Sequence, residues 1–341
     1  MSLTFIGPVA EQGGPAIKNA LTLKYLGASD VNLINTYSTS ISARLRSLAS
    51  TVFCRDKRII LGVSRKGRAL LWPVVELKSR FDAGLRYGLV CIGGTVAEEA
   101  AENPRLVRAM KRADVVAVET LGVKEKLVGL GISENVYHFP NFVEGLGNSC
   151  VPHASISQTG SLRCVFLSSV RDKKGVRTMV NACQKALAAG CNITLDIYGP
   201  IKTDFDRSIL DRLDCNGPIC YRGVVPKDKV TATLAGYDCF VFPSEYEAEG
   251  FPSVLAEAMA VGLPVIASDV CYNPEIVGAD GGWIFRAGDI EELANLFAEC
   301  AGNRPLLDRI SDCNIKRAQR WDAAHVVTGF AEKLIEEGWE L

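Results

Sequence analysis

The chain is constrained above all by the regular alternation of short apolar segments with helix-like segments along nearly its whole length. Helix-like segments of about ten residues, such as Val123–Leu130 and Val176–Ala189, separate apolar segments of strand length. The apolar segments carry hydrophobic side chains at both odd and even positions, as strands covered on two faces do. This order predicts an α/β fold with parallel sheets and helices on both faces. The expected strands are Leu3–Gly7, Val31–Asn35, Arg58–Val63, Leu89–Ile92, Val115–Glu119, Val136–Phe139, Cys164–Ser168, Thr194–Tyr198, Cys220–Gly223, Cys239–Pro243 and Pro264–Ser268.

The 341 residues are enough for about two domains. Residues 141–162 hold several Gly, Pro and Ser residues and show no hydrophobic period, which predicts a linker. We therefore expect one doubly wound, Rossmann-like domain over residues 1–150 and a second over residues 151–323, facing each other across a cleft. Ligands of such sheets bind beyond the carboxyl ends of the strands, so functional residues are expected just after strands.

Composition argues against several other classes. The formal net charge of -1 disfavours a nucleic-acid-binding protein. The first residues lack the basic and apolar regions of a secretory signal, and no apolar run approaches the ~20 residues that span a bilayer. The 12 cysteines are scattered without a C-x-x-C pair and the chain holds three His, which favours reduced thiols over a zinc site. We expect a cytoplasmic protein.

The overall charge hides a basic segment. Residues 44–86 contain eleven Lys and Arg against three Asp and Glu, a local balance of +8. The apolar residues 70–74 lie within it. Such a segment could rest on an anionic membrane, where each Lys or Arg near the surface contributes ~1 kcal/mol. An ordinary basic surface, with residues 70–74 in a core-facing helix, is an equally good interpretation.

The most informative stretch follows the expected strand Cys239–Pro243. A loop with three glutamates precedes a helix that we expect from Pro252, at its first position, to about Val261. Glu249 lies just before this helix and Glu257 about two turns into it.

Free backbone N–H groups at the start of a helix favour an anion such as phosphate, here those of Phe251, Ser253 and Val254. This arrangement suits a nucleotide-sugar. Glu257 could accept hydrogen bonds from the ribose hydroxyls, the backbone amides could bind the diphosphate, and Glu249 could accept from the sugar hydroxyls. For either glutamate alone, a plainer interpretation holds: Glu249 stabilises the helix dipole and Glu257 belongs to a solvated face. Against it, the neighbours of Glu257 are Ala and Met, which indicates a buried helix in which a carboxylate needs a partner.

Residues 249–267, EGFPSVLAEAMAVGLPVIA, resemble the E-x7-E region of retaining GT-B glycosyltransferases, the large group often called family 4. Seven residues separate Glu249 from Glu257, as the motif requires. The doubled Glu247-Ala248-Glu249 and the later Cys271–Glu275 resemble the branch that builds capsular and other surface polysaccharides. In this family Glu249 would orient the donor sugar, with Gly250 to Val254 beside the donor.

A second resemblance lies upstream, at residues 164–176. This strand, basic loop and helix are similar to the segment that opens the donor domain in the family, and Lys174 falls on its diphosphate-binding lysine. The family usually has Arg where this chain has Ser169. Arg171, two residues later, is the candidate to replace it, and with Lys174 it would offset the charge of the departing diphosphate. Without the E-x7-E match, this loop would be interpreted as a solvated charge cluster.

Two glycine pairs follow strands of the first half. Gly13 and Gly14 follow the first expected strand; in the family this loop approaches the donor phosphates. Gly93 and Gly94 follow the strand Leu89–Ile92 and are similar to a loop that lines the acceptor side of the cleft. Many relatives carry a His in this region, and this sequence has none near Gly93.

The resemblance implies a GT-B enzyme of the hexosyltransferase type that moves a sugar, with retention, from a UDP- or GDP-sugar to a hydroxyl of a glycan or lipid-linked glycan. It implies front-face attack without a tightly bound metal or cofactor. Residues 1–150 would bind the acceptor, residues 151–323 the donor, and the last helix, about 324–341, would pack back on the first domain. The enzyme would lie in the cytoplasm, on the inner face of the membrane if residues 44–86 bind lipid. A non-catalytic nucleotide-sugar-binding subunit and a GT-B nucleotide-sugar 2-epimerase are the alternatives.

Overall fold

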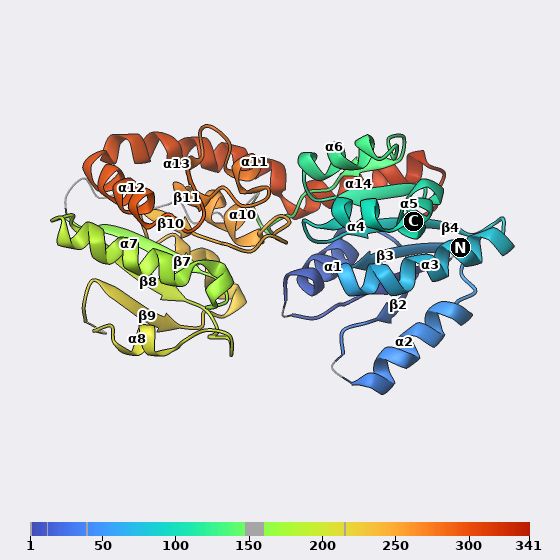
Figure 1. The fold of residues 1–341 in the computed structure, drawn as a ribbon. Helices are drawn as coiled ribbons and strands as arrows, with labels where there is room; N and C mark the ends of the chain where they lie inside the picture. Colours follow the sequence, from blue (N-terminus) through green and yellow to red (C-terminus); the bar gives the residue numbers. More distant parts are fainter. Residues whose placement is uncertain (1, 12, 39, 147–159, 215) are drawn as a thin grey trace. The chain divides into compact units, whose positions relative to one another are not determined.

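The computed structural model describes residues 2–11, 13–38, 40–146, 160–214 and 216–341. The chain forms two compact units, coloured along the sequence in Figure 1. Unit 1 comprises Met1–Glu144, Ala248–Phe251 and Trp321–Leu341, and unit 2 comprises Gly145–Glu247 and Pro252–Arg320. The expected domain boundary between residues 150 and 151 lies outside the described residues.

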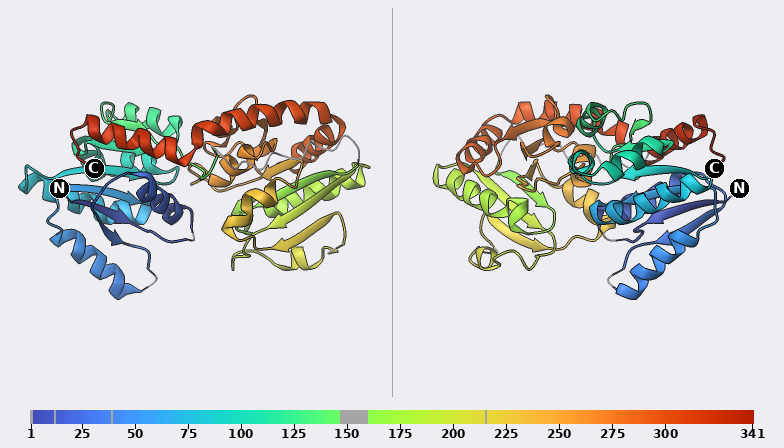
Figure 2. Two further views of the ribbon diagram at one scale, coloured as in Figure 1. Left: turned by 180° about the vertical axis from the view of Figure 1, so that it is seen from behind. Right: turned by 45° about the vertical axis from the view of Figure 1, so that its right-hand side comes forward.

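Unit 1 is built on a six-stranded parallel sheet with the order β2-β1-β3-β4-β5-β6. Phe5 and Val115 of the sheet pack against Phe330 and Leu334 of the last helix in one continuous core. That helix, α14, lies beside the other helices of this unit in both views of Figure 2. The strands are β1 Leu3–Gly7, β2 Val31–Asn35, β3 Arg58–Val63, β4 Arg86–Cys91, β5 Val115–Val118 and β6 Val136–His138. The helices are α1 Gly14–Tyr25, α2 Ile41–Phe53, α3 Arg65–Phe81, α4 Val96–Glu102, α5 Pro104–Arg112, α6 Leu121–Gly129 and α14 Ala323–Glu336.

Unit 2 is built on a second six-stranded parallel sheet with the order β12-β11-β10-β7-β8-β9. Its core joins the sheet to α7 and α12 through residues such as Phe166, Met179 and Phe297. The strands are β7 Leu162–Leu167, β8 Ile193–Tyr198, β9 Ile219–Gly223, β10 Cys239–Phe242, β11 Val265–Ser268 and β12 Gly282–Phe285. The helices are α7 Val176–Ala188, α8 Ser208–Asp211, α9 Val230–Leu234, α10 Ser253–Ala260, α11 Asn273–Val277, α12 Ile290–Gly302 and α13 Arg304–Ala318, with short 3-10 turns at η1 Asp172–Lys174, η2 Lys227–Lys229 and η3 Gln319–Trp321.

The prediction of two doubly wound α/β sheets is confirmed, and the expected strands fall on β1 to β11 with ends shifted by at most a few residues. The sequence analysis missed β12, Gly282–Phe285. This strand pairs only with β11 along the edge of the sheet, and three of its four residues are partly exposed. Its apolar run, Trp283 to Phe285, has only three residues and lies between glycines and an arginine, so the pattern did not indicate a strand.

Two local predictions were wrong. Residues 141–143, expected to be part of the linker, belong to unit 1, because Phe142 and Val143 are buried and Val143 bonds through its backbone to both Trp321 and Ala323. Pro252 is the residue before α10 rather than its first helical residue, since its backbone is extended, with φ -61° and ψ 114°. The helix therefore begins one residue later than expected, at Ser253.

Candidate functional site

The loop after β4 meets the residue after β5 at the same edge of the unit 1 sheet. The two strands are parallel neighbours, so their carboxyl ends lie side by side. Gly93 follows β4 with φ +104°, a conformation that favours glycine. Its N–H donates to Oε2 of Glu119, which follows β5, at 3.0 Å.

A buried lysine completes this cluster. Lys18 lies on α1 with 2% of its surface exposed, and its Nζ is 3.0 Å from Oε1 of Glu119, itself 4% exposed. Nζ also donates to the carbonyl oxygen of Phe139 at 3.2 Å and lies 4.8 Å from the centre of the Phe139 ring. Burial lowers the pKa of Lys18, although the Glu119 carboxylate acts in the opposite direction. The two groups form an ion pair enclosed by protein.

The segment Ala248–Phe251 belongs to unit 1 by its contacts, although its chain neighbours belong to unit 2. The N–H of Gly94 donates to the carbonyl of Ala248 at 3.4 Å. Asn141 Nδ2 donates to the carbonyl of Phe251 at 2.9 Å, and the Phe251 ring packs edge-on against Trp321. The segment is thus held at both of its ends.

Gly250 makes the closest approach in this segment. A Cβ at this position would clash with Oε2 of Glu119 and would lie 2.9 Å from the Cα of Gly93. Glu249, next to it, is 8% exposed. Unit 1 therefore brings Gly93, Gly94, Glu249 and Gly250 together around Glu119.

The remaining site glycines of unit 1 lie at the start of α1. Gly13 precedes the helix with φ +88°, and its carbonyl accepts from the N–H groups of Ala16 and Ile17. A Cβ on Gly13 or Gly14 would meet nothing within 4 Å. Space beside this turn is open, as a loop that approaches a ligand requires, and the same helix carries Lys18 one turn later.

Lys174 of unit 2 lies at the end of η1, just before α7. Its Nζ is 5.2 Å from the ring centre of Phe242 in β10 and 5.8 Å from that of Tyr246. Gly175 follows with φ +66°, and a Cβ there would clash with the carbonyl oxygen of Pro243. Glycine at this position lets the lysine loop pack directly on the end of β10.

Arg171 lies in the same basic loop but is engaged within the unit. Its guanidinium donates to Oδ2 of Asp204 at 2.8 Å, and both side chains are partly exposed. These hydrogen bonds hold the pKa of Asp204 below its usual value. Arg171 would have to exchange this carboxylate for a phosphate to serve in the role expected of it.

Glu257 lies within α10, and its neighbours Ala256 and Ala258 are completely buried. Burial raises the pKa of Glu257 to about 7, with a smaller opposing effect from the charge of Lys227. Ser253 and Val254 form the first turn of the same helix. Unit 2 thus places Lys174 and Glu257 in one parallel-sheet unit, Lys174 in the turn that follows β7 and Glu257 in the helix that follows β10.

Sequence analysis missed Lys18 and Glu119. Glu119 was included only as the end of an expected strand, and Lys18 was not singled out. The detectable signal was weak: a carboxylate directly after an apolar strand, and a lysine one turn after a glycine pair. Nothing in the linear pattern indicates that the two charges meet, because they lie 101 positions apart in the sequence.

No metal site is evident in the described part of the chain, where no three His, Cys, Asp or Glu side chains gather as ligands would. The helices within that part are likewise too short or too polar to cross a membrane.

Comparisons with known proteins agree with this architecture. The crystal structure of Anabaena Alr3699/HepE in complex with UDP aligns with a TM-score of 0.78 over 98% of this chain and 100% of that chain, at 17% identity. The chain has the GT-B fold. Residues 161–303 match the family model described as Glycosyl transferases group 1.

Two curated relatives match part of the GT-B chain. The putative colanic acid biosynthesis glycosyltransferase WcaL of Salmonella typhimurium is 31% identical over 155 residues, which cover 43% of this chain and 38% of the relative. The amylovoran biosynthesis glycosyltransferase AmsK of Erwinia amylovora is 31% identical over 140 residues, covering 39% and 34%. The chain therefore spans less than two-fifths of the length of either relative.

Proposed function

We propose that the protein is a retaining glycosyltransferase of polysaccharide biosynthesis that moves a sugar from a nucleotide-sugar to a hydroxyl of a glycan or lipid-linked glycan. The observation that carries this proposal is the position of Lys174 and Glu257. Both lie within residues 161–303, the part of the chain that matches the glycosyltransferase family model. Both also follow strands of one parallel sheet, the place where such sheets bind ligands.

Unit 2 is the proposed donor-binding unit. Lys174 and Arg171 would offset the charge of the diphosphate, Glu257 would accept from the ribose hydroxyls, and the first turn of α10 would supply amides to phosphate. Support for a nucleotide-sugar comes from Alr3699/HepE, which has been crystallised with UDP and with UDP-glucose. We propose a UDP- or GDP-sugar as the donor and no tightly bound cofactor. The proposed donor-side residues in or next to α10 are Gly250, Phe251, Pro252, Ser253, Val254 and Glu257.

Unit 1 is the proposed acceptor-binding unit, with Gly93 and Gly94 beside the acceptor and Gly13 and Gly14 near the donor phosphates. Glu249 would orient the donor sugar. In the proposed reaction the acceptor hydroxyl attacks the anomeric carbon from the side of the leaving group. The C–O bond to the diphosphate breaks, the new glycosidic bond forms, and the hydroxyl proton passes to the departing diphosphate. Lys174 stabilises the negative charge that develops on that group.

The test is transfer by purified protein. Thermal-shift screening of UDP, GDP and ADP and of their sugars identifies the donor, and product anomers report retention. We expect Glu249→Ala and Lys174→Ala each to lower kcat at least about tenfold, and Glu257→Ala mainly to weaken nucleotide binding. Glu291→Ala, an exposed residue of α12, is the matched control. Near-normal kinetics for all three site variants would refute the assignment.

One alternative function keeps specific support: a non-catalytic subunit that binds nucleotide-sugar. Ser169 stands where the family usually has Arg, and no His lies near Gly93 in the sequence. Donor binding without transfer or hydrolysis would favour this function. The 2-epimerase would be recognised by conversion of the donor sugar itself.

We further propose that unit 1 contacts an anionic membrane, with the enzyme at the cytoplasmic face. The structure reduces the basic segment 44–86 to a smaller surface. Arg68 is fully buried against Glu99, and Lys78 donates to the carbonyls of residues 51, 52 and 54 at the end of α2. The exposed basic residues around α2 are Arg44, Arg46, Arg55 and Lys57, of which Lys57 is paired with Asp82, and the partly exposed Asp56 lies between the last two.

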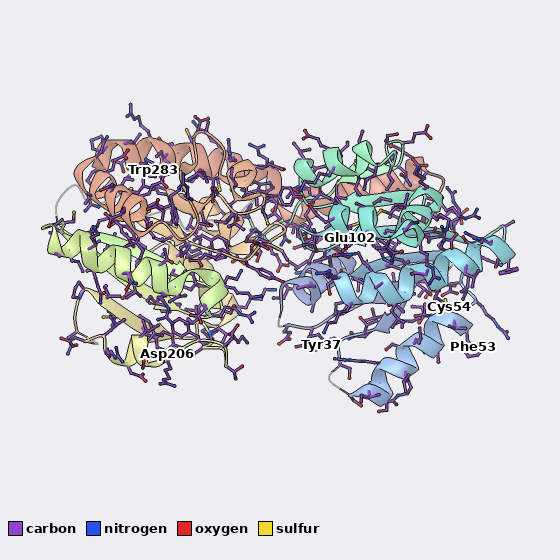
Figure 3. The ribbon with its side chains drawn as sticks, viewed as in Figure 1. Tyr37, Phe53, Cys54, Glu102, Asp206 and Trp283 are labelled. Carbon is purple, nitrogen blue, oxygen red and sulfur yellow. The ribbon has the colours of Figure 1, made fainter. Side chains whose placement is uncertain are left out.

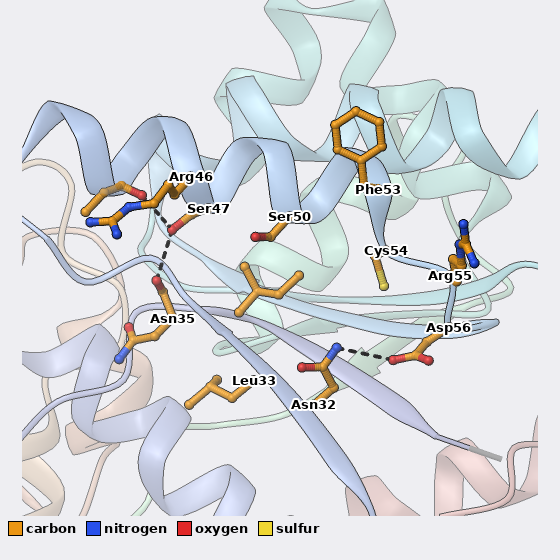
Figure 4. Close-up of a pocket in the computed structure, with 12 residues that line it drawn as sticks. Asn32, Leu33, Asn35, Arg46, Ser47, Ser50, Phe53, Cys54, Arg55 and Asp56 are labelled. Carbon is orange, nitrogen blue, oxygen red and sulfur yellow. Dashed lines mark hydrogen bonds between the residues drawn. The ribbon is translucent and has the colours of Figure 1, made fainter.

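Helix α2 carries its apolar residues on the side away from the sheet. Ile41, Leu45 and Val52 recur on one face of the helix and are 75%, 61% and 44% exposed. The polar face turns inward: Ser47 Oγ donates to the carbonyl of Asn35 in β2 (Figure 4). A groove of about 700 Å³ separates the two elements. Phe53, labelled at the end of α2 in Figure 3, is 79% exposed. Exposed apolar residues flanked by arginines suit an anionic lipid surface.

Vesicle co-sedimentation tests this contact. We expect binding to phosphatidylcholine vesicles that contain phosphatidylglycerol, weakening with salt, and loss of binding in Ile41→Ser/Leu45→Ser. Ile335→Ser, which removes an exposed apolar residue of α14, is the matched control. The protein should bind less well to vesicles of phosphatidylcholine alone. If it fails to bind vesicles with or without phosphatidylglycerol, at low and at high salt, this proposal is refuted and the proposed transfer reaction is unaffected.

A further inference from the structure

Glu119 bridges two donors from different parts of unit 1. One carboxylate oxygen accepts from the ammonium group of Lys18 and the other from the backbone N–H of Gly93, both at 3.0 Å. Each oxygen thus has its own donor. A neutral amide in this place has a single oxygen and could satisfy only one of them.

The same oxygen that accepts from Gly93 also lies against Gly250, where any Cβ would clash with it. Gly94 is bonded to Ala248, two residues before Gly250. The loop after β4 and the segment Ala248–Phe251 are therefore assembled around one carboxylate, and that carboxylate is fixed by Lys18. Lys18 in turn is held by the carbonyl and the ring of Phe139 and has little room to move.

A buried ion pair is a costly way to stabilise a core, since apolar residues of similar volume often serve as well. Here it places a rigid acceptor beneath two backbone segments that approach each other at glycines. We propose that Lys18 and Glu119 are positioning residues of the transfer reaction, which hold Gly93 and Gly94 against the loop that carries Glu249. This inference rests on the proposed function for its kinetic consequences, while its structural consequence can be measured without activity.

Kinetics separate positioning from binding. Lys18→Met and Glu119→Gln should each lower kcat by tenfold or more, because a misplacement of about 1 Å near the reacting groups costs up to ~10²-fold. The affinity for the nucleotide should stay within about twofold, because Arg171, Lys174 and Glu257, the side chains proposed to bind the diphosphate and the ribose, lie in unit 2. The double variant Lys18→Met/Glu119→Gln removes both charges and leaves the Gln oxygen free to accept from Gly93, so it should recover much of the lost kcat. Lys24→Met, which breaks an exposed ion pair on the same helix, is the matched control.

Hydrogen exchange tests the structural part directly. In Lys18→Met the amides of residues 92–95 and 248–251 should exchange faster than in the wild type, while Lys24→Met should leave them unchanged. If Lys18→Met does not fold, Gly250→Ala perturbs the same contact without removing a charge, with Gly129→Ala, whose Cβ would meet nothing within 4 Å, as its control.

The proposal is overturned if amide exchange of residues 92–95 and 248–251 is unchanged in Lys18→Met, or if exchange rises uniformly throughout unit 1. It is also overturned if Lys18→Met and Glu119→Gln both keep the kcat of the wild type. If the wild-type protein transfers no sugar, the proposed function fails, and exchange alone then decides whether the pair positions the two segments.

Discussion

The raised pKa of Glu257 gives a measurable pH dependence of stability. Burial raises this pKa from 4.5 to about 7 in the folded protein. The folded state therefore binds the Glu257 proton more tightly than the unfolded state does. The contribution of Glu257 to the free energy of unfolding is fully present below pH 4.5 and falls as the pH rises from 4.5 towards 7. Above pH 7 this contribution has been lost and changes no further.

The size of the effect follows from the shift. At about 1.4 kcal/mol for each pH unit, the full shift corresponds to roughly 3 kcal/mol. Glu257 is partly exposed, so solvent screening reduces the expected loss to about 1–2 kcal/mol between pH 5 and pH 8. Glu257→Gln removes the titration and should be more stable than the wild type at pH 8 by this amount, with the two nearly equal at pH 5.

Urea unfolding at the two pH values measures this difference. Trp283 is the single tryptophan of the sequence within residues 145–247 and 252–320, so its part of the fluorescence change reports on unit 2, while Trp72, Trp321 and Trp339 report on unit 1. Glu291→Gln on α12 serves as the control, because an exposed ion pair contributes little to stability. The quantity compared is the difference in free energy of unfolding between Glu257→Gln and the wild type. If this difference is the same at pH 8 as at pH 5, the argument from burial is refuted.

Three further predictions follow from close contacts. Gly175→Ala forces a Cβ against the carbonyl of Pro243 at positive φ and should destabilise unit 2 by several kcal/mol, measured by the same urea titration. Arg68→Met removes the nearer cation of the buried Glu99 carboxylate, leaving the exposed Arg65 at 3.8 Å, and should cost up to about 3–5 kcal/mol in the unfolding of unit 1. Asp204→Asn weakens the hold on Arg171 and should raise UDP affinity a few-fold by calorimetry if that arginine binds the diphosphate; unchanged affinity would exclude that role.

The fold was predictable because its strands are covered on both sides. Continuous apolar runs such as Val115–Val118 and Cys239–Phe242 are fully buried and leave a strong trace in the sequence. The edge strand Gly282–Phe285 leaves a shorter trace of three apolar residues, and only Phe285 of them is fully buried. Capping was predictable to within one residue at α10, where Pro252 supplied an extended backbone rather than the first helical position.

The candidate site was predictable only where its residues are close in the chain. Glu249, Glu257 and Lys174 lie in short motifs that can be recognised by spacing. The meeting of Lys18, Glu119 and Gly250 joins residues that lie at least 101 positions apart in the sequence, and no local pattern encodes it. The burial of Arg68, one of the basic residues of segment 44–86, was unpredictable for a similar reason, since its partner Glu99 lies 31 positions away.

The return of the chain to unit 1 at Trp321 has a consequence for synthesis on the ribosome. The core of unit 1 includes Phe330 and Leu334 of α14, which pack with residues from β1 and β5. Residues 1–144 leave the ribosome long before this helix exists, so their apolar surface stays uncovered while unit 2 is made. Unit 2 can complete its own core first, and the first part of the chain to be translated is the last to finish folding.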